Sequence, residues 1–194
     1  MSACAAANSG GGKANQYFLR GFNLDHGTDF ATSVEGMPVN LPTHGHGQGY
    51  TDLNFVIPEL VDRIVYRKGT YYPELGHFSA AGAADVTYRG ASAPFATLTA
   101  GQNGYARAVA GGSTPALGGD VLAALEHDRS DGPWQLPQEL RKYNGVLRYT
   151  RSGARGGVAI DAMGYDGRWR STEKAMAKKR AISARALSDI ASWA

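Results

Sequence analysis

The chain has 194 residues, a length that suits one ordinary domain or two small modules that share a boundary. Its formal net charge of +3 is too small to indicate a nucleic-acid partner, and its single cysteine, Cys4, excludes an internal disulfide framework. No apolar run approaches the roughly 18–20 residues that a membrane-spanning helix needs. Membrane β-strands stay open, because each needs only about 9–11 residues with one apolar face.

The first part of the chain, from Met1 to about Arg89, is rich in glycine, and short β-type runs lie between its loops. The acidic-Gly pair Glu35-Gly36 is typical of a turn that joins two hairpin strands. The expected elements, in chain order, are a strand at 17–20, hairpin strands at 30–34 and 37–40, a polar loop at 41–51, a short helix at 58–63 and a strand at 64–66. These elements predict a small mixed α+β module over residues 1–89.

From about residue 90 to 172 the pattern changes to strands that have one polar and one apolar face. Period-2 alternation predicts strands at 121–128, 141–150 and 157–165, with turns at 111–115, 131–133 and 152–153. This pattern is typical of an antiparallel meander or barrel, and a soluble β-sandwich alternates in the same way. Aromatic residues fall near the expected strand ends, where a lipid-facing barrel would carry them: Tyr105, Trp134, Tyr143, Tyr149, Tyr165 and Trp169.

The tail, residues 173–194, has a different period. Apolar side chains recur at helical spacing at Ile182, Ala186, Ile190 and Trp193, with strong helix formers between them. The spacing predicts an amphipathic C-terminal helix.

Two loops hold most of the groups that could carry chemistry. The first is Asp25-His26-Gly27-Thr28-Asp29 and the second runs from Thr43 to Tyr50. Three imidazoles and two carboxylates could bind a transition metal, but no single helix or strand presents them together, so hydrogen-bonding loops or ligand contacts are the better interpretation. No Walker spacing and no Gly-x-Ser-x-Gly elbow occurs. We therefore expect no catalytic residues, no resident metal and no cofactor.

Five motifs in the first part occur in a characteristic order. They are Leu19-Arg20-Gly21-Phe22, Glu35-Gly36-Met37-Pro38-Val39, the stretch 57–64 (IPELVDRI), Lys68-Gly69-Thr70 and Ala80-Ala81-Gly82. In this order they resemble the plug domain of TonB-dependent receptors. The resemblance covers about residues 14–89 and continues to Trp169 as early barrel strands, through Asp131-Gly132-Pro133-Trp134 and the stretch 144–149 (NGVLRY).

The resemblance implies a fold and its boundaries. It implies a partial plug with a small mixed sheet and short helices at 1–89, the first antiparallel strands of a partial transmembrane β-barrel at 90–172, and an unassigned tail at 173–194. By resemblance, the chain is a fragment that starts inside the plug and stops after roughly five barrel strands. Plug cations pair with carboxylates of the barrel wall in this family, which makes Arg20, Lys68 and Glu126 candidates. Lys68 stands where the family has arginine, so it supplies the charge without the two-pronged guanidinium geometry.

The resemblance also implies a function for the parent protein. Such a receptor lies in the outer membrane of a Gram-negative cell, binds a scarce nutrient such as a ferric siderophore, and takes energy from the TonB–ExbB–ExbD complex through a segment outside this sequence. Its partners are a small-molecule ligand and outer-membrane lipid, with no nucleic acid and no enzymatic step. Carried over by motif, the outward-facing loops give the ligand-binding candidates Asp25, His26, Thr28, Asp29, His44, His46, Gln48 and Tyr50. The alternatives are a soluble metal-dependent enzyme and a β-rich binding module, each using the histidine loops.

Overall fold

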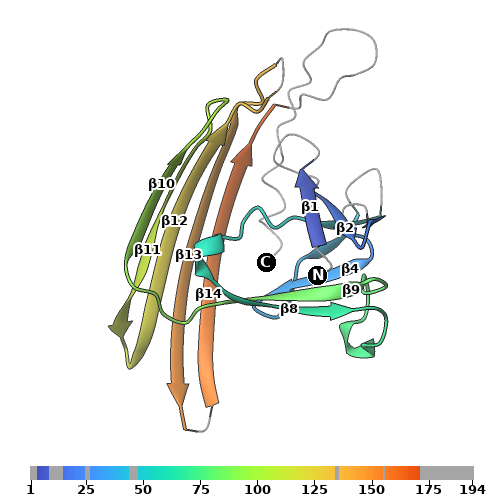
Figure 1. Ribbon diagram of the computed structural model, residues 1–194. Helices are drawn as coiled ribbons and strands as arrows, with labels where there is room; N and C mark the ends of the chain where they lie inside the picture. Colours follow the sequence, from blue (N-terminus) through green and yellow to red (C-terminus); the bar gives the residue numbers. More distant parts are fainter. Residues whose placement is uncertain are drawn as a thin grey trace. The chain divides into compact units, whose positions relative to one another are not determined.

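The computed structural model describes residues 4–8, 15–24, 27–43, 48–133, 136–154 and 156–170. They form two compact units (Figure 1). The first unit comprises the described residues up to Asn54 together with Pro58–Tyr88. The second comprises Phe55–Ile57 and the described residues from Arg89 onward.

A four-stranded mixed sheet forms the centre of the first unit. Its order is β5 (Met37–Pro38), β4 (Phe30–Val34), β9 (Gly82–Tyr88) and β8 (Val61–Lys68). The β4/β9 pair is parallel and the other two pairs are antiparallel, so the predicted mixed sheet is confirmed. Burial alternates along β4, because every second side chain faces the core. Phe30 is in the same cluster as Tyr17, Leu19, Leu24 and Ala84.

The predicted hairpin at Glu35-Gly36 is confirmed. Val34 pairs with Met37, and the two turn residues have φ values of 53° and 75°. Positive φ at both central positions is the geometry of a type I′ turn, which matches the twist of the flanking strands. Glycine supplies the second of these conformations without steric cost.

The remaining elements of the first unit are short. They are β1 (Cys4–Asn8), β2 (Asn15–Leu19) and β3 (Phe22–Asn23) in one sheet, β6 (Asn40–Thr43) and β7 (Gln48–Thr51) in a second, and the 3₁₀ turns η1 (Pro58–Leu60) and η2 (Pro73–Leu75).

Two sequence predictions for this unit were wrong in part. The segment 41–51 was expected to be a polar loop, but its two ends belong to β6 and β7, which pair antiparallel with each other. The expected helix at 58–63 is only the 3₁₀ turn Pro58–Leu60, and the chain enters β8 at Val61. Pairing with a neighbouring strand satisfies the backbone groups of β8, and this tertiary gain outweighs local helix propensity.

The second unit is a five-stranded antiparallel meander. Its strands lie side by side in chain order: β10 (Phe95–Ala100), β11 (Ala106–Ala116), β12 (Gly119–Ser130), β13 (Leu140–Gly153) and β14 (Gly156–Arg168) (Figure 1). The three strands predicted at 121–128, 141–150 and 157–165 are confirmed, and each extends beyond its predicted ends.

The predicted turn at 111–115 was wrong. These residues lie inside β11, and the chain turns at Leu117-Gly118. Gly111 serves close packing instead of a turn: a Cβ there would lie 2.7 Å from the Ala124 Cβ and 2.9 Å from the Phe95 ring. A glycine inside a strand often marks such a close approach.

Candidate functional site

The side chain of Asn40 joins three segments of the first unit. Its oxygen accepts a hydrogen bond from the Thr32 N–H at 2.6 Å. Its amide nitrogen lies 3.0 Å from the Gly27 carbonyl, 3.0 Å from the Phe30 carbonyl and 2.6 Å from the Thr51 hydroxyl. Thr51 is fully buried, so these contacts are largely shielded from water. Asn40 therefore fixes the loop before β4 against the hairpin β6–β7.

Two close backbone approaches bring the same segments together. A Cβ at Gly27 would lie 2.4 Å from the Thr51 hydroxyl oxygen, and a Cβ at Gly49 would lie 2.7 Å from the Thr28 Cα. Real Cβ atoms do not come so near, so only glycine fits at these positions without a shift. The two loops that the sequence marked separately as ligand candidates are therefore neighbours where the structure describes them.

The predicted ligand residues have different surroundings. Thr28 is half-buried and Asp29 is exposed. Tyr50 is only 4% exposed, and its hydroxyl donates to the Asp52 carboxylate at 3.4 Å. Gln48 begins β7. Asp25, His26, His44 and His46 lie outside the described residues, as do Trp134 and the tail predicted to be helical.

Within the described ranges, no three His, Cys, Asp or Glu side chains gather closely enough to hold a metal ion. Over the same part of the chain, no helix has the length and apolar character needed to cross a membrane.

A cluster of four charges and one amide covers one face of the second unit's sheet. Glu126 on β12 accepts hydrogen bonds from Arg107 Nε at 2.8 Å and Asn144 Nδ2 at 2.8 Å, and its carboxylate lies 3.3 Å from Lys142 Nζ. Lys142 Nζ also lies 3.6 Å from Asp128. The Glu126 side chain is 1% exposed, and the two cations balance the two carboxylates. We call this set the inner-face cluster.

An ion pair between Arg148 and Asp161 lies on the same face. Arg148 donates to Asp161 at 2.9 Å, and their side chains are 7% and 18% exposed. Arg148 on β13 is directly opposite Asp161 on β14, so the register of the strands makes the pair. Each charge of this face that is mostly buried thus has an opposite charge beside it, as burial requires.

The other face of the sheet has the reverse character. Leu98, Leu125 and Leu147 are 85%, 72% and 53% exposed, although they are large apolar side chains. Val158 and Ile160 on β14 are 57% and 62% exposed on the same side. We call this surface the outer face. A soluble sheet buries its apolar side and exposes its charges. Here large apolar side chains are exposed on the outer face, while paired charges are buried on the other face among Val109, Leu122 and Val146.

The three predicted ion-pair residues differ in exposure. Arg20 is exposed in a turn with φ 53°, and Lys68 is exposed at the end of β8. Glu126 is buried, and the partners given for it above belong to its own sheet.

Two residues of these sites were missed by the sequence reasoning. Asn40 was read only as the end of a hairpin strand, and its contacts depend on a tertiary arrangement that no local pattern reports. Arg107 was missed because β11 was not recognised. Its alternation with Val109 and Ala108 was the signal available, since Arg107 and Val109 face one side and Ala108 the other.

The first unit has the architecture of a small mixed-sheet module with short connecting hairpins and 3₁₀ turns. Residues 1–83 match the family model described as TonB-dependent Receptor Plug Domain. This segment is therefore similar to the plug domains of TonB-dependent receptors, and the match covers less than half of the chain. Proteins of this family are transporters rather than enzymes, and they reside in the outer membrane. None of the curated proteins matches the chain significantly.

Proposed function

We propose that the chain forms part of an outer-membrane receptor that takes up a scarce nutrient with energy delivered through TonB, ExbB and ExbD. In this proposal the first unit is the plug, and β10–β14 are the first strands of a transmembrane barrel. The observation that carries the proposal is the exchange of faces in the sheet: exposed leucines on the outer face, and buried, paired charges on the other.

The outer face has dimensions that suit a bilayer. On β13 the outward positions run from Arg141 through Tyr143, Gly145, Leu147 and Tyr149 to Arg151, so uncharged residues separate two arginines ten positions apart. Ten residues of antiparallel strand span about 34 Å. At a tilt of about 40° this corresponds to roughly 26 Å along the membrane normal, close to the apolar band of about 25 Å that outer-membrane barrels carry.

The connections between the strands support one orientation. Two residues separate β11 from β12 and β13 from β14, whereas five residues separate β10 from β11 and nine separate β12 from β13. Outer-membrane barrels have short periplasmic turns and longer external loops. We therefore place the Leu117-Gly118 end of the sheet on the periplasmic side and the Asp131 end outside.

The paired charges suit a water-filled or plug-filled interior. Glu126, Arg107, Lys142 and Asp128 balance one another, so this wall offers hydrogen bonds without a strong net field. Arg20 and Lys68 stay our candidates for plug cations that pair with the barrel wall.

We further propose that the two neighbouring loops of the plug form part of the ligand floor, with His26, His44, His46, Gln48 and Tyr50 as its residues. The junction at Asn40 supports this, because it holds the loop before β4 beside β7. A ferric siderophore is the ligand class we favour, as the resemblance to TonB-dependent receptors implies. Replacing the five residues together in the full-length parent should weaken ligand binding, and unchanged affinity would exclude this floor.

A labelling experiment tests the membrane assignment. In a full-length parent without its native cysteines, Leu125→Cys and Leu117→Cys each receive a fluorescent probe, and the protein is reconstituted into phosphatidylcholine vesicles that carry a quencher in the acyl region. Leu125 lies in the middle of the outer face. Leu117 lies in a turn, and this residue is 86% exposed. We expect strong quenching at 125 and weak quenching at 117. Equal, weak quenching at both positions would refute the membrane assignment and favour a soluble β-rich module.

A further inference from the structure

Three arginines stand in one row on the outer face. Arg129 on β12 is directly opposite Arg141 on β13, and Arg141 is directly opposite Arg168 on β14. Opposed residues in an antiparallel pair have Cα atoms about 4.5–5.5 Å apart, so the three side chains emerge within about 10 Å of one another. All three are exposed. We call this set the arginine row.

The arginine row is only partly neutralised by the chain itself. Arg168 pairs with Asp166 at 3.1 Å. Arg129 and Arg141 make no ion pair with any residue that the structure describes. Like charges directly opposite across strands are destabilising. The row therefore favours an anion from outside the chain, and guanidinium groups bind phosphate oxygens in a two-pronged geometry.

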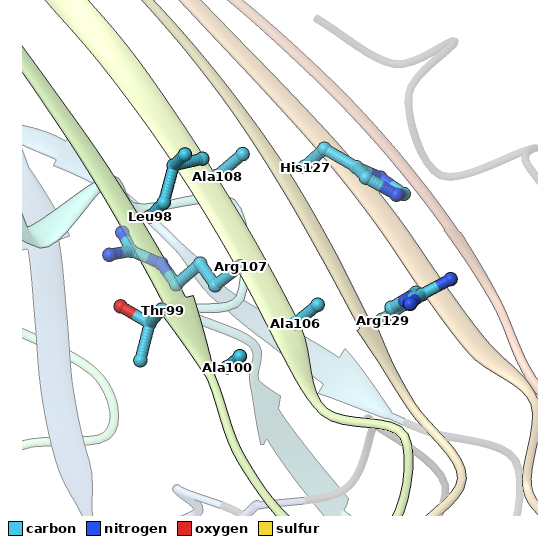
Figure 2. A pocket seen from close by; sticks show the side chains of 8 residues that line it. All are labelled: Leu98, Thr99, Ala100, Ala106, Arg107, Ala108, His127 and Arg129. Atoms are coloured by element: carbon cyan, nitrogen blue, oxygen red, sulfur yellow. The ribbon is translucent and has the colours of Figure 1, made fainter.

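Two hollows meet at this row. The first, of about 520 Å³, is lined by Arg129 and Arg141 together with His127, Tyr143 and the loop residues Asp131 and Glu139. The second, of about 410 Å³, is lined largely by small and apolar side chains, among them Leu98, Ala106 and Ala108, and Figure 2 shows these beside His127 and Arg129. His127 and Arg129 line both hollows. The polar hollow over β12 and β13 thus continues across the strands into the apolar one over β12, β11 and β10.

An aromatic pair is the next outward pair after Arg129 and Arg141 along β12 and β13. His127 and Tyr143 are opposed in register, and their rings stack with centroids 4.5 Å apart at 21°. Along β12 the outward residues run from Leu125 through His127 to Arg129. Aromatic residues of this kind sit where the hydrocarbon of a bilayer meets its headgroups.

We propose that the arginine row and the apolar hollow together bind one lipid with a phosphate-bearing headgroup, in the leaflet that faces outward. The phosphate lies between Arg129 and Arg141, and an acyl chain follows the hollow along Leu98 and Ala108. This inference rests on the membrane assignment made above and adds a specific lipid site to it.

A titration with a defined lipid tests the site. The chain is held in neutral detergent micelles, and fluorescent phosphatidic acid is titrated into the wild type, the double variant Arg129→Gln/Arg141→Gln and the control Arg151→Gln. Arg151 is an outward arginine on β13, the strand of Arg141, and it lies at the opposite end of that strand. Its partner on β14 is Val158. A basic residue near an anionic lipid surface contributes about a fivefold gain in affinity, so we expect the double variant to bind about 25-fold more weakly. The control should change less than fivefold.

Further arms identify the source of the phosphate. Unlabelled phosphatidic acid should displace the probe, whereas inorganic phosphate at the same concentration should not; equal displacement by both would overturn a lipid site. Equal affinity for labelled diacylglycerol, which has the acyl chains without the phosphate, or an unchanged affinity of the double variant, would also overturn it. If the double variant does not fold, the salt dependence of wild-type binding is measured instead. Lipid binding should weaken as the ionic strength rises, and salt-independent binding would overturn the role of the arginine row. Failure of the full-length parent to insert into phosphatidylcholine vesicles would instead refute the membrane assignment.

Discussion

Asn40 and Thr51 are partners in the register of β6 and β7, and the Asn40 side-chain amide donates to the Thr51 hydroxyl at 2.6 Å. The same amide reaches the carbonyls of Gly27 and Phe30, so one side chain connects a hairpin to a loop ten or more residues earlier in the chain. Tyr17 adds a second connection, since its hydroxyl donates to the Thr51 carbonyl at 3.2 Å. The stability of this corner of the first unit thus depends on a few buried polar groups.

Asn40→Ala should lower the free energy of unfolding of the chain by about 2–3 kcal/mol, because it leaves buried carbonyl and hydroxyl groups without partners. The measurement is a urea titration followed by circular dichroism. Thr70→Ala, at an exposed position of the same unit, is the control and should change stability by less than about 0.5 kcal/mol. Equal effects of the two substitutions would show that the Asn40 contacts add nothing to stability.

Gly49→Ala should destabilise the chain more than Gly36→Ala. Both glycines have positive φ, 76° and 75°, so both substitutions carry a similar backbone cost of about 1 kcal/mol. A Cβ added at Gly49 would lie 2.7 Å from the Thr28 Cα, whereas a Cβ added at Gly36 would meet nothing within 4 Å. Overpacking adds about 1–3 kcal/mol at Gly49 alone. Paired denaturation curves give the difference directly, and identical midpoints would contradict the close approach of the two loops.

Glu126→Gln should destabilise the second unit by about 3 kcal/mol, since it leaves Arg107 and Lys142 facing a neutral group in a mostly buried place. Glu139→Gln, which breaks an exposed pair with Arg170, should cost less than about 1 kcal/mol. Thermal unfolding in detergent compares the two.

A double-mutant cycle separates the possible partners of Glu126. Coupling with Arg107→Gln is expected from the 2.8 Å contact. Strong coupling with Arg20→Gln, and none with Arg107→Gln, would instead assign Glu126 to a plug–barrel ion pair.

Leu125→Arg should reduce the stability of the reconstituted chain by about 2–4 kcal/mol, the cost of an arginine that faces lipid near the bilayer midplane. Leu117→Arg, in the turn between β11 and β12, should cost at most about 1 kcal/mol. Unfolding from vesicles with increasing denaturant gives both values. If the two variants lose the same small amount of stability, the outer face does not contact hydrocarbon.

Much of the strand pattern could be predicted from the sequence because the signals were local. The turn Glu35-Gly36 carries its own backbone requirement, and the alternation in β12, β13 and β14 fixes which side chains share a face. Lys142, Asn144 and Arg148 are separated by even numbers of residues, so a period of two puts them on one face, and the register of β13 does so too.

The parts that could not be predicted depend on distant partners. β6 and β7 are strands because they pair with each other across a polar stretch, and Val61 begins a strand because β9 lies beside it. Gly111 and Gly112 looked like a turn, since glycine serves both turns and close packing and the sequence does not say which. The same holds for the sites. The sequence shows which residue types are present, but the junction at Asn40 and the arginine row depend on how the strands pair.

The register of β11–β14 assigns each residue to one side of the sheet. A change in the number of residues in these strands is therefore less tolerated than a substitution. Deleting a single residue from the middle of β12 would turn Glu126 toward the side of Leu125 and reverse every residue on that arm of the strand. Conservative replacements should therefore accumulate freely among relatives, while gains and losses of residues gather in the connections after Ala100 and Ser130.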